Sequence, residues 1–447
     1  MLTTVKKIAR HWSMPRPAGP AAIEPLSLRR NVSWTFVGNV VYAGCQWGMI
    51  VVLAKLGNAE MVGRFALGFA ITAPVILFAN LQLRAVQATD ATGEYDFGHY
   101  LGLRLISTSL ALVVILGITC LAGYRLETAA VILVIGVAKA MESFSDVYYG
   151  LLQKWERMDR IAISMMIKGP LSLLALGACV YLTGSVFWGV VGVALSWGVT
   201  LLLYDVPNAA SLSKHRMCSP SGATQPASEL PWTLRPCWDV AQLGTLAGRA
   251  FPLGVVMMLI SLNTNIPRYF IESFQGEREL GIFASMAYVV VVATIITGAL
   301  GQSASPKLAA YYAHGDMGRF YALLSKLVTL IALLGVLGIG IALIAGRWLL
   351  TVVYDAEIAS HSDVFAWLMA ATAFAAAGSI LGYAITATRL YHKFTAPYAA
   401  ATMLTLVCSA LLIPKFGILG AAWTVCATAA ATCIVPFMIL RSSWRRS

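Results

Sequence analysis

Residues 328–345 read VTLIALLGVLGIGIALIA, a run of eighteen residues that contains no charged side chain. An α-helix rises 1.5 Å per residue, so this run approaches the roughly 30 Å of hydrocarbon in a lipid bilayer. A segment in that hydrocarbon has to satisfy its backbone hydrogen bonds, which only a helix or a closed β-barrel does. Because the apolar residues are continuous and do not alternate with polar ones, the run predicts a membrane-spanning helix.

Comparable apolar runs recur about twelve times along the 447 residues, with short polar connections between them. Hydrophobic residues make up 59% of the chain and charged residues 12%, and the mean hydropathy is +0.75. A soluble protein carries about 25% charged residues, so the composition predicts an all-α polytopic membrane protein. We expect spans at residues 31–54, 65–86, 102–122, 128–152, 161–183, 186–206, 247–267, 281–304, 320–345, 363–387, 395–413 and 417–440.

Lys and Arg are distributed unevenly between the two sides that these spans define. With a cytoplasmic N-terminus, 24 of the 32 Lys and Arg residues lie on the inner side and 7 on the outer side, with Lys139 inside a span. Cytoplasmic segments carry the basic excess in membrane proteins, so we expect both termini in the cytoplasm. The net charge of +12 then reflects orientation and contact with anionic membrane lipids, and we expect no nucleic-acid partner.

The longest connection divides the chain into two sets of six spans. Residues 207–240 are rich in Pro, Ser and Ala, which predicts a cytoplasmic linker. We therefore expect a cytoplasmic segment at 1–30 with no cleavable signal, an N-lobe at 31–206, a C-lobe at 241–440 and a cytoplasmic tail at 441–447.

The two predicted lobes share several motifs at nearly constant spacing. The matches are Gly63-x-Phe65-Ala66 with Gly281-x-Phe283-Ala284, Asp96-x-Gly98 with Asp316-x-Gly318, and GVVGVA at 189–194 with GILGAA at 417–422. With an even number of spans per half, both halves enter the membrane from the same side. The chain is therefore expected to contain parallel repeats related by an axis along the membrane normal, with a substrate path between them at mid-membrane.

The predicted span 128–152 carries three ionisable residues on one helical face. Lys139, Glu142 and Asp146 follow the spacing i, i+3 and i+7. Ionisable groups are costly at membrane depth and indicate a partner, a cavity or a role in transport. One interpretation gives these residues a cavity-lining or ion-coupling role, and the other makes Lys139 and Glu142 a pair that only orients the helix.

Two other spans carry polar groups, which we expect to line a water-filled path or to form hydrogen bonds between helices. Asn39 and Gln46 share a face of the first span, and Asn263 and Asn265 precede Pro267 near the end of the seventh. We expect Pro267 to end that helix and to leave Arg268 as a fixed positive charge near the outer rim. The Arg fork binds two phosphate oxygens at once. The alternative is an interfacial Arg that snorkels from a helix end.

Several cations lie near the inner ends of the spans, namely Arg84, Arg104, Lys168, Arg249 and Lys307. They predict an inner vestibule that attracts an anion, although the positive-inside rule alone also accounts for their position. The chain contains no GxxxxGK[ST], HExxH or GxSxG motif and no CxxC pair. We therefore expect a protein that is not an enzyme and that uses no cofactor or metal.

The sequence resembles the bacterial polysaccharide and O-antigen flippases of the multidrug/oligosaccharidyl-lipid/polysaccharide exporter (MOP) superfamily. The resemblance extends from about Leu28 to Arg441. It is carried by NVSWTFVGNVVYAGCQWGMIVVLAKLG at 31–57, EMVGRFALGFAITAPVILFANLQLR at 60–84, ESFSDVYYGLLQKWERMDRIA at 142–162, NTNIPRYFIESFQGERELGIFASMAYV at 263–289 and ALGQSASPKLA at 299–309.

This resemblance implies two six-helix bundles in a V around a central cavity in the bacterial inner membrane. It implies translocation of an undecaprenyl-diphosphate-linked oligosaccharide to the periplasmic leaflet, for lipopolysaccharide or exopolysaccharide biosynthesis. Basic residues lining the cavity would then contact the diphosphate. We assign this role to Arg84, Arg249 and Arg268, with Lys139, Glu142 and Asp146 as polar cavity or ion-coupling groups. Polysaccharide polymerase and export proteins are possible partners, and a monomer is expected because both halves lie in one chain.

Two other functions remain open from the sequence. A multidrug or small-cation exporter of the same superfamily needs an N-lobe carboxylate for ion exchange, which Glu142 or Asp146 would supply, although basic cavity groups disfavour cationic drugs. A membrane glycosyltransferase or polymerase needs a sizeable external loop. The longest expected outer connection, Arg347 to Ser362, has only about sixteen residues.

Overall fold

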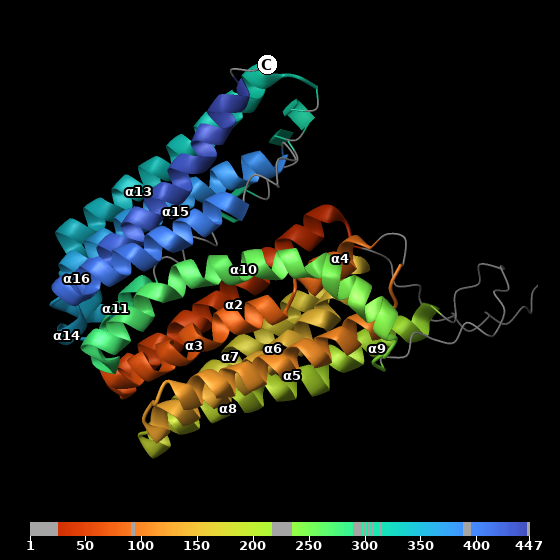
Figure 1. The fold of residues 1–447 in the computed structure, drawn as a ribbon, viewed down its shortest axis with the longest axis horizontal. Helices are drawn as coiled ribbons and strands as arrows, with labels where there is room; N and C mark the ends of the chain where they lie inside the picture. Colours follow the sequence, from red (N-terminus) through yellow and green to blue (C-terminus); the bar gives the residue numbers. More distant parts are fainter. Residues whose placement is uncertain are drawn as a thin grey trace, which may run out of the picture.

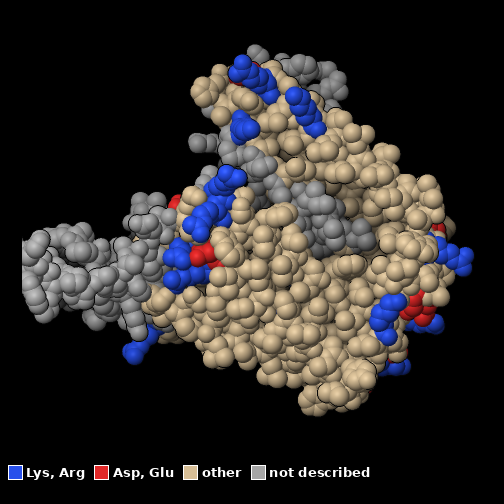
Figure 2. All heavy atoms as spheres, turned by 180° about the vertical axis from the view of Figure 1, so that it is seen from behind, with Lys and Arg blue, Asp and Glu red and all other residues tan. Residues whose placement is uncertain are grey.

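The computed structural model describes residues 26–90, 94–216, 235–288, 297–298, 300–301, 304, 307–308, 310–312, 314–387 and 395–444. All regular structure in these ranges is helical. Ten helices are long and apolar enough to cross a membrane. Figure 2 shows the charged side chains gathered toward opposite ends of the molecule, with a broad uncharged band between them. The expectation of an all-α polytopic membrane protein is confirmed.

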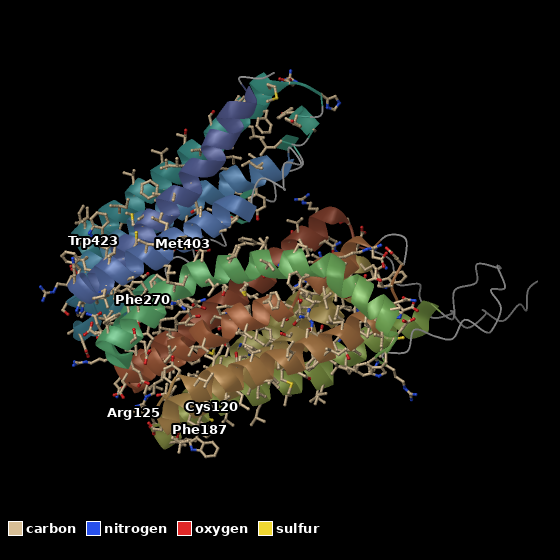
Figure 3. All side chains as sticks on the ribbon, viewed as in Figure 1. Cys120, Arg125, Phe187, Phe270, Met403 and Trp423 are labelled. Atoms are coloured by element: carbon tan, nitrogen blue, oxygen red, sulfur yellow. The ribbon has the colours of Figure 1, made fainter. Side chains whose placement is uncertain are left out.

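The first half of the chain forms one bundle (Figure 1). Its helices are α2 (Leu28–Leu56), α3 (Ala59–Ala79), α4 (Leu83–Thr89), α5 (Phe97–Leu121), α6 (Leu126–Lys154), α7 (Met158–Thr183), α8 (Val186–Thr200) and α9 (Val206–Arg216), with a π-helical turn at Leu201–Asp205. Figure 3 places Cys120, Arg125 and Phe187 together at one end of this bundle, where α5 ends and where α6 and α8 begin.

The second half contributes α10 (Val240–Gln275), α11 (Glu277–Ala287), α13 (Met317–Val353), α14 (Ala356–Ala359), α15 (Ser362–Ala387) and α16 (Thr395–Trp444). Helix α15 packs on both α13 and α16, and α16 also packs along α10. Figure 3 labels Phe270 of α10 and Met403 of α16 on these neighbouring helices.

The two bundles come together at one end of the molecule and diverge toward the other (Figure 1). We call these the α14 end and the α4 end. The largest group of packed apolar side chains includes residues of both halves, among them Leu53, Phe65 and Ile132 from the first and Phe283 and Phe365 from the second. The arrangement is the V that the family resemblance implied.

Helix α10 connects the two bundles. Its first turns pack on the first half, where Leu243, Leu246 and Ala250 join a cluster with Tyr100 and Leu151. The expected end at Pro267 is wrong. The helix continues through Pro252 and Pro267 to Gln275, which is possible in a membrane because neighbouring groups satisfy the freed carbonyls.

One other boundary differs from the sequence prediction, and one agrees with it. The expected span 65–86 breaks after Ala79, where Leu81 and Gln82 adopt positive φ. Helix α16 contains a kink at Gly417, whose φ of +62° separates the two spans expected at 395–413 and 417–440. Much of the expected span 281–304 and of the expected linker 207–240 lies outside the described residues, so the exact number of twelve spans and the domain boundaries stay predictions.

The two halves approach most closely where α3 crosses α11. A Cβ atom on Gly63 would lie 1.7 Å from the carbonyl oxygen of Glu277, and one on Gly281 would lie 1.8 Å from that of Ala59. Contact between real Cβ and oxygen atoms is much longer than this, so only glycine allows this crossing. The short separation brings the α14 ends of the two bundles into backbone contact.

Candidate transport site

Helix α6 supplies the centre of a charged network in the first half. Lys139, Glu142 and Asp146 lie on one face, as their spacing predicts, and each has an oppositely charged partner. The side chains of Glu142 and Asp146 remain 31% and 28% exposed, although they lie within a membrane span. The network therefore borders accessible space.

Lys139 and Glu142 pair with each other. The Lys139 Nζ lies 2.7 Å from Glu142 Oε2 and within 5.3 Å of the ring centroids of Phe69 and Trp197. The Tyr42 hydroxyl of α2 donates to Glu142 Oε1 at 2.9 Å. The pairing of the two residues is therefore present, while both the orienting role and the coupling role stay predictions. Glu142 also connects α6 to α2.

Asp146 lies between two arginines from different elements. Its Oδ1 is 3.5 Å from Arg84 Nη1, and its Oδ2 is 3.4 Å from Arg104 Nη2. Arg104 is fully buried and also donates to the Asn80 side chain, while its Nε has no hydrogen-bond partner among the described residues. Arg84 is 30% exposed, and its guanidinium lies 5.5 Å from the Tyr149 ring centroid.

A second ion pair lies deeper in the same bundle. Lys168 is 2% exposed and Asp205 fully buried, with 4.0 Å between Nζ and Oδ2. Lys168 also donates to Ser145 Oγ at 3.0 Å and to Tyr149 at 3.3 Å, and Ser164 donates to Asp205. Asp205 ends the π-helical turn. Such turns occur frequently at functional sites. The sequence analysis placed Lys168 near an inner vestibule and did not single out Asp205.

The polar face of α2 lies beside this network. At 100° per residue, Asn39, Tyr42 and Gln46 fall within about 60° of one another. Gln46 lies next to the Tyr42 hydroxyl, which is itself bonded to Glu142. Asn39 is exposed. The predicted sharing of a face is therefore present, and Tyr42 directs this face toward α6.

Arg268 is a half-buried cation of the second half. Its Nη1 donates to Asn265 Oδ1 at 3.3 Å, and its buried Nε has no partner among the described residues. No carboxylate of the described chain lies within ion-pair distance of it. The Asn263 Oδ1 is likewise buried without a partner there. Tyr288 interacts electrostatically with both Arg268 and Glu142, so the polar groups of the two halves lie near each other.

Arg249 is separated from this group. It is 56% exposed and pairs with Glu94 at 2.6 Å, with its guanidinium 5.8 Å from the Tyr95 ring centroid. Glu94 lies between Asp90, which pairs with Lys154, and Asp96, which caps α5. Arg249 therefore attaches α10 to the first half.

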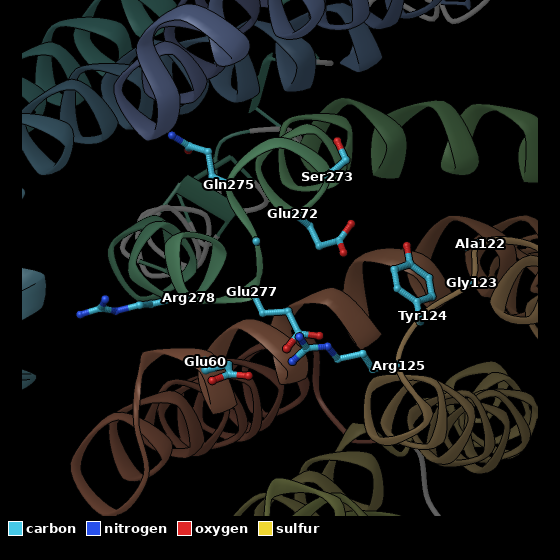
Figure 4. A pocket seen from close by; sticks show the side chains of 11 residues that line it. Glu60, Ala122, Gly123, Tyr124, Arg125, Glu272, Ser273, Gln275, Glu277 and Arg278 are labelled. Carbon is cyan, nitrogen blue, oxygen red and sulfur yellow. The ribbon is translucent and has the colours of Figure 1, made fainter.

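A pocket of about 670 Å³ lies at the α14 end, between residues 122–125 and 272–278. In Figure 4, Arg278 and Gln275 are directed away from Glu272 and Glu277. Burial and the nearby Glu272 carboxylate raise the pKa of Tyr124 to about 12. No predicted site residue lines this pocket. Groups of three or more His, Cys, Asp or Glu that could hold a metal are absent from the described residues.

The polar interior carries an excess of positive charge. Arg84, Arg104, Lys139, Lys168 and Arg268 are five cations, and their partners Glu142, Asp146 and Asp205 are three carboxylates. The excess of two charges suits a polyvalent anion. Among the cations of this set that form ion pairs, Arg84 is the most exposed, at 30%, and Arg268 has no carboxylate partner in the described chain. These two arginines are therefore the groups best placed to bind it.

A family model described as polysaccharide biosynthesis protein matches residues 28–205. The capsular polysaccharide biosynthesis protein CapF of Staphylococcus aureus is 28% identical over 400 residues, which cover 89% of this chain and 95% of the relative. These two similarities fit the polysaccharide flippase family that the sequence resembles.

Two solved structures have a similar fold. The lipid II flippase MurJ in an inward closed conformation matches with a TM-score of 0.70 and 12% identity, over 92% of this chain and 87% of MurJ. An inward-facing multidrug resistance MATE transporter matches with a TM-score of 0.67 and 12% identity, over 91% and 94%. At these identities the likeness establishes the fold alone.

Proposed function

We propose that this transporter flips an undecaprenyl-diphosphate-linked oligosaccharide from the cytoplasmic to the periplasmic leaflet of the bacterial inner membrane, for surface or exopolysaccharide synthesis. The observation that carries the proposal is Arg268, a cation inside the protein with no carboxylate partner in the described chain. An unpaired buried charge is costly, and an anionic substrate offsets that cost. The match to the polysaccharide biosynthesis family supports this substrate class.

In this proposal the diphosphate binds between the two halves. Arg268 donates from the second half and Arg84 from the first, while Asn263 and Asn265 complete the polar surface beside Arg268. The amides of Asn39 and Gln46 are suited to sugar hydroxyls because each donates and accepts hydrogen bonds. The polyprenyl tail stays in the lipid at the opening between the bundles, and rocking of the halves exposes the site to the other leaflet.

The ion-coupling role is proposed for Glu142 in preference to Asp146. Asp146 lies between two arginines, whereas Glu142 is held by one lysine and by a hydroxyl from α2. A change in the charge of Glu142 therefore alters a contact between two helices. We further propose that the protein acts as a monomer without catalysing a reaction, with both termini in the cytoplasm and beside polymerase and export proteins.

The test is reconstitution of the purified protein into liposomes that contain undecaprenyl diphosphate bearing one fluorescent sugar. Transport is the fraction of label that becomes protected from, or accessible to, a reagent outside the liposome. We expect the wild-type protein to accelerate this exchange, Arg268→Gln to abolish most of it, and the monophosphate analogue to be a poor substrate. Arg278→Gln is the matched control, since Arg278 is a surface residue paired with Glu357 within the same half.

Exchange of the diphosphate lipid at the rate of empty liposomes would contradict the proposal. If the protein instead moved a lipophilic cation against a proton or Na⁺ gradient, the alternative of a multidrug exporter would replace it. Release of a free sugar or a lengthened glycan would indicate a membrane glycosyltransferase or polymerase.

A further inference from the structure

The contact between α3 and α11 is reciprocal. Gly63 packs on the backbone of Glu277, and Gly281 packs on the backbone of Ala59. The separations from Ala59 to Glu277 and from Gly63 to Gly281 are both 218 residues. The same two positions of the repeat therefore exchange roles across the crossing. In a symmetric dimer, such exchange marks the two-fold axis, so the two halves meet here at their internal axis.

Arg64 lies beside this crossing and contacts three carboxylates. Its Nε is 2.8 Å from Glu277 of α11, its Nη1 2.5 Å from Glu127 of α6 and its Nη2 2.5 Å from Glu60 of α3. The arginine is 15% exposed, as is Glu277. The Thr128 hydroxyl also donates to Glu277. We call Arg64 with Glu60, Glu127 and Glu277 the Arg64 cluster.

Two further hydrogen bonds join the halves near this crossing. The Tyr269 hydroxyl donates to the carbonyl oxygen of Ala70, and the Trp47 indole donates to Tyr354 at 2.9 Å. Tyr354 in turn donates to the carbonyl oxygen of Ser285 at 2.8 Å. The α4 end differs, because the bundles diverge there (Figure 1) and the basic residue Arg249 attaches α10 to the first half.

We propose that the Arg64 cluster holds the α14 end closed, and that Arg64 must leave Glu277 when this end opens to expose the site on its other side. The electrostatics favour this role. Without Arg64, three carboxylates from three helices would face one another, and like charges at such distances repel. Loss of the arginine therefore converts the cluster from an attraction between the halves into a repulsion.

The experiment measures how readily the α14 end opens. It uses Ser285→Cys as the single cysteine of a chain in which the eight native cysteines have been replaced. Ser285 is fully buried and lies one turn beyond Gly281, on the face of α11 that packs against α3. The probe is a water-soluble maleimide added to the purified protein in lipid nanodiscs. Both ends are accessible in nanodiscs, so the assay requires neither a known orientation nor a substrate.

We expect Arg64→Gln to increase the rate of maleimide labelling at least about fivefold over the parent protein. The matched control is Arg278→Gln. It removes the same charge from the same end, but the Arg278–Glu357 pair joins α11 to α14 within the second half, so its labelling rate should equal that of the parent. An equal increase in both variants would overturn the proposal.

Two further variants keep the proposal testable if Arg64→Gln does not fold. Glu277→Gln removes the cross-half carboxylate and should give a smaller increase than Arg64→Gln. Gly63→Ala places a methyl group against the Glu277 carbonyl oxygen and should increase labelling without any change in charge. If both variants were labelled by the maleimide at the rate of the parent protein, the proposed role of this crossing would be refuted. Because no substrate is present, that result would leave the proposed flippase activity unaffected.

Discussion

The buried charges of the two halves are satisfied in different ways. In the first half, Lys168 and Asp205 pair with each other inside the bundle at 4.0 Å. Hydroxyl groups bond to Lys168 Nζ and to Asp205 Oδ1, while Asp205 Oδ2 has no hydrogen-bond partner in the described chain. In the second half, Arg268 donates to the Asn265 side chain, and its Nε is buried without a partner in the described chain. Both cations lie within membrane spans.

This difference separates charges that stabilise the fold from charges available to a substrate. A buried pair that loses one member leaves an uncompensated charge, so its main effect is on stability. A buried cation without a counter-charge already carries a desolvation cost, so neutralising it relieves the fold while removing a binding group. The two sites therefore predict opposite outcomes for similar substitutions.

The largest expected effect is on stability, from Lys168→Met. It leaves Asp205 buried without its cation, and breaking a buried pair costs about 3–5 kcal/mol. We expect a sharp loss of monodisperse protein and a lower unfolding temperature, measured by fluorescence-detected size exclusion after heating. The double variant Lys168→Met with Asp205→Leu should recover much of the loss, since it removes both charges. A double variant no more stable than Lys168→Met would show that the pair does not set stability here.

Arg268→Gln should give the opposite result. Its unfolding temperature should equal or exceed that of the wild type, while transport of a diphosphate lipid should fall. A charge-assisted hydrogen bond contributes about 1.5–3 kcal/mol, which corresponds to a loss of roughly 10- to 100-fold in affinity. The measurement is the apparent affinity for undecaprenyl diphosphate together with the unfolding temperature. A variant that loses stability in parallel with transport would place Arg268 with the structural charges.

The sequence predicted the parts of this arrangement that depend on local periodicity. The apolar spans, the common face of Lys139, Glu142 and Asp146, and the Lys139–Glu142 pair follow from helical spacing alone. The partners Tyr42 and Asp205 did not, because they lie 100 and 37 residues from Glu142 and Lys168 and meet them only through tertiary packing.

The sequence errors also have a physical explanation. Proline ends most helices in water, but α10 continues through Pro252 and Pro267 because a membrane interior offers the backbone no other partner. The family resemblance implies one diphosphate role for Arg249 and Arg268. Their environments differ because Glu94 and Tyr95, which belong to another segment, contact Arg249. The sequence pattern around Arg249 does not predict such a tertiary contact.

A smaller effect is expected from Tyr42→Phe, which tests the connection between α2 and α6. The change removes the hydroxyl that donates to Glu142 and keeps the ring. The free energy of unfolding should therefore fall by about 1 kcal/mol or less at this half-buried site. If Glu142 couples transport to protons, the pH at which transport is half-maximal should move upward, because a donor that favours the charged carboxylate has been lost. Phe69→Leu, beside Lys139, is the control. An unchanged pH profile would assign Tyr42 to packing alone.

The smallest effect is expected from Arg249→Gln, although the sequence placed this residue in the diphosphate site. Arg249 and Glu94 are both about half exposed, and exposed ion pairs are screened by solvent and salt. We expect an unchanged unfolding temperature and an unchanged affinity for undecaprenyl diphosphate, measured beside Arg268→Gln in the same lipid. A loss of affinity as large as that of Arg268→Gln would mean that α10 brings both arginines to one substrate, and that exposure does not distinguish binding cations from structural ones.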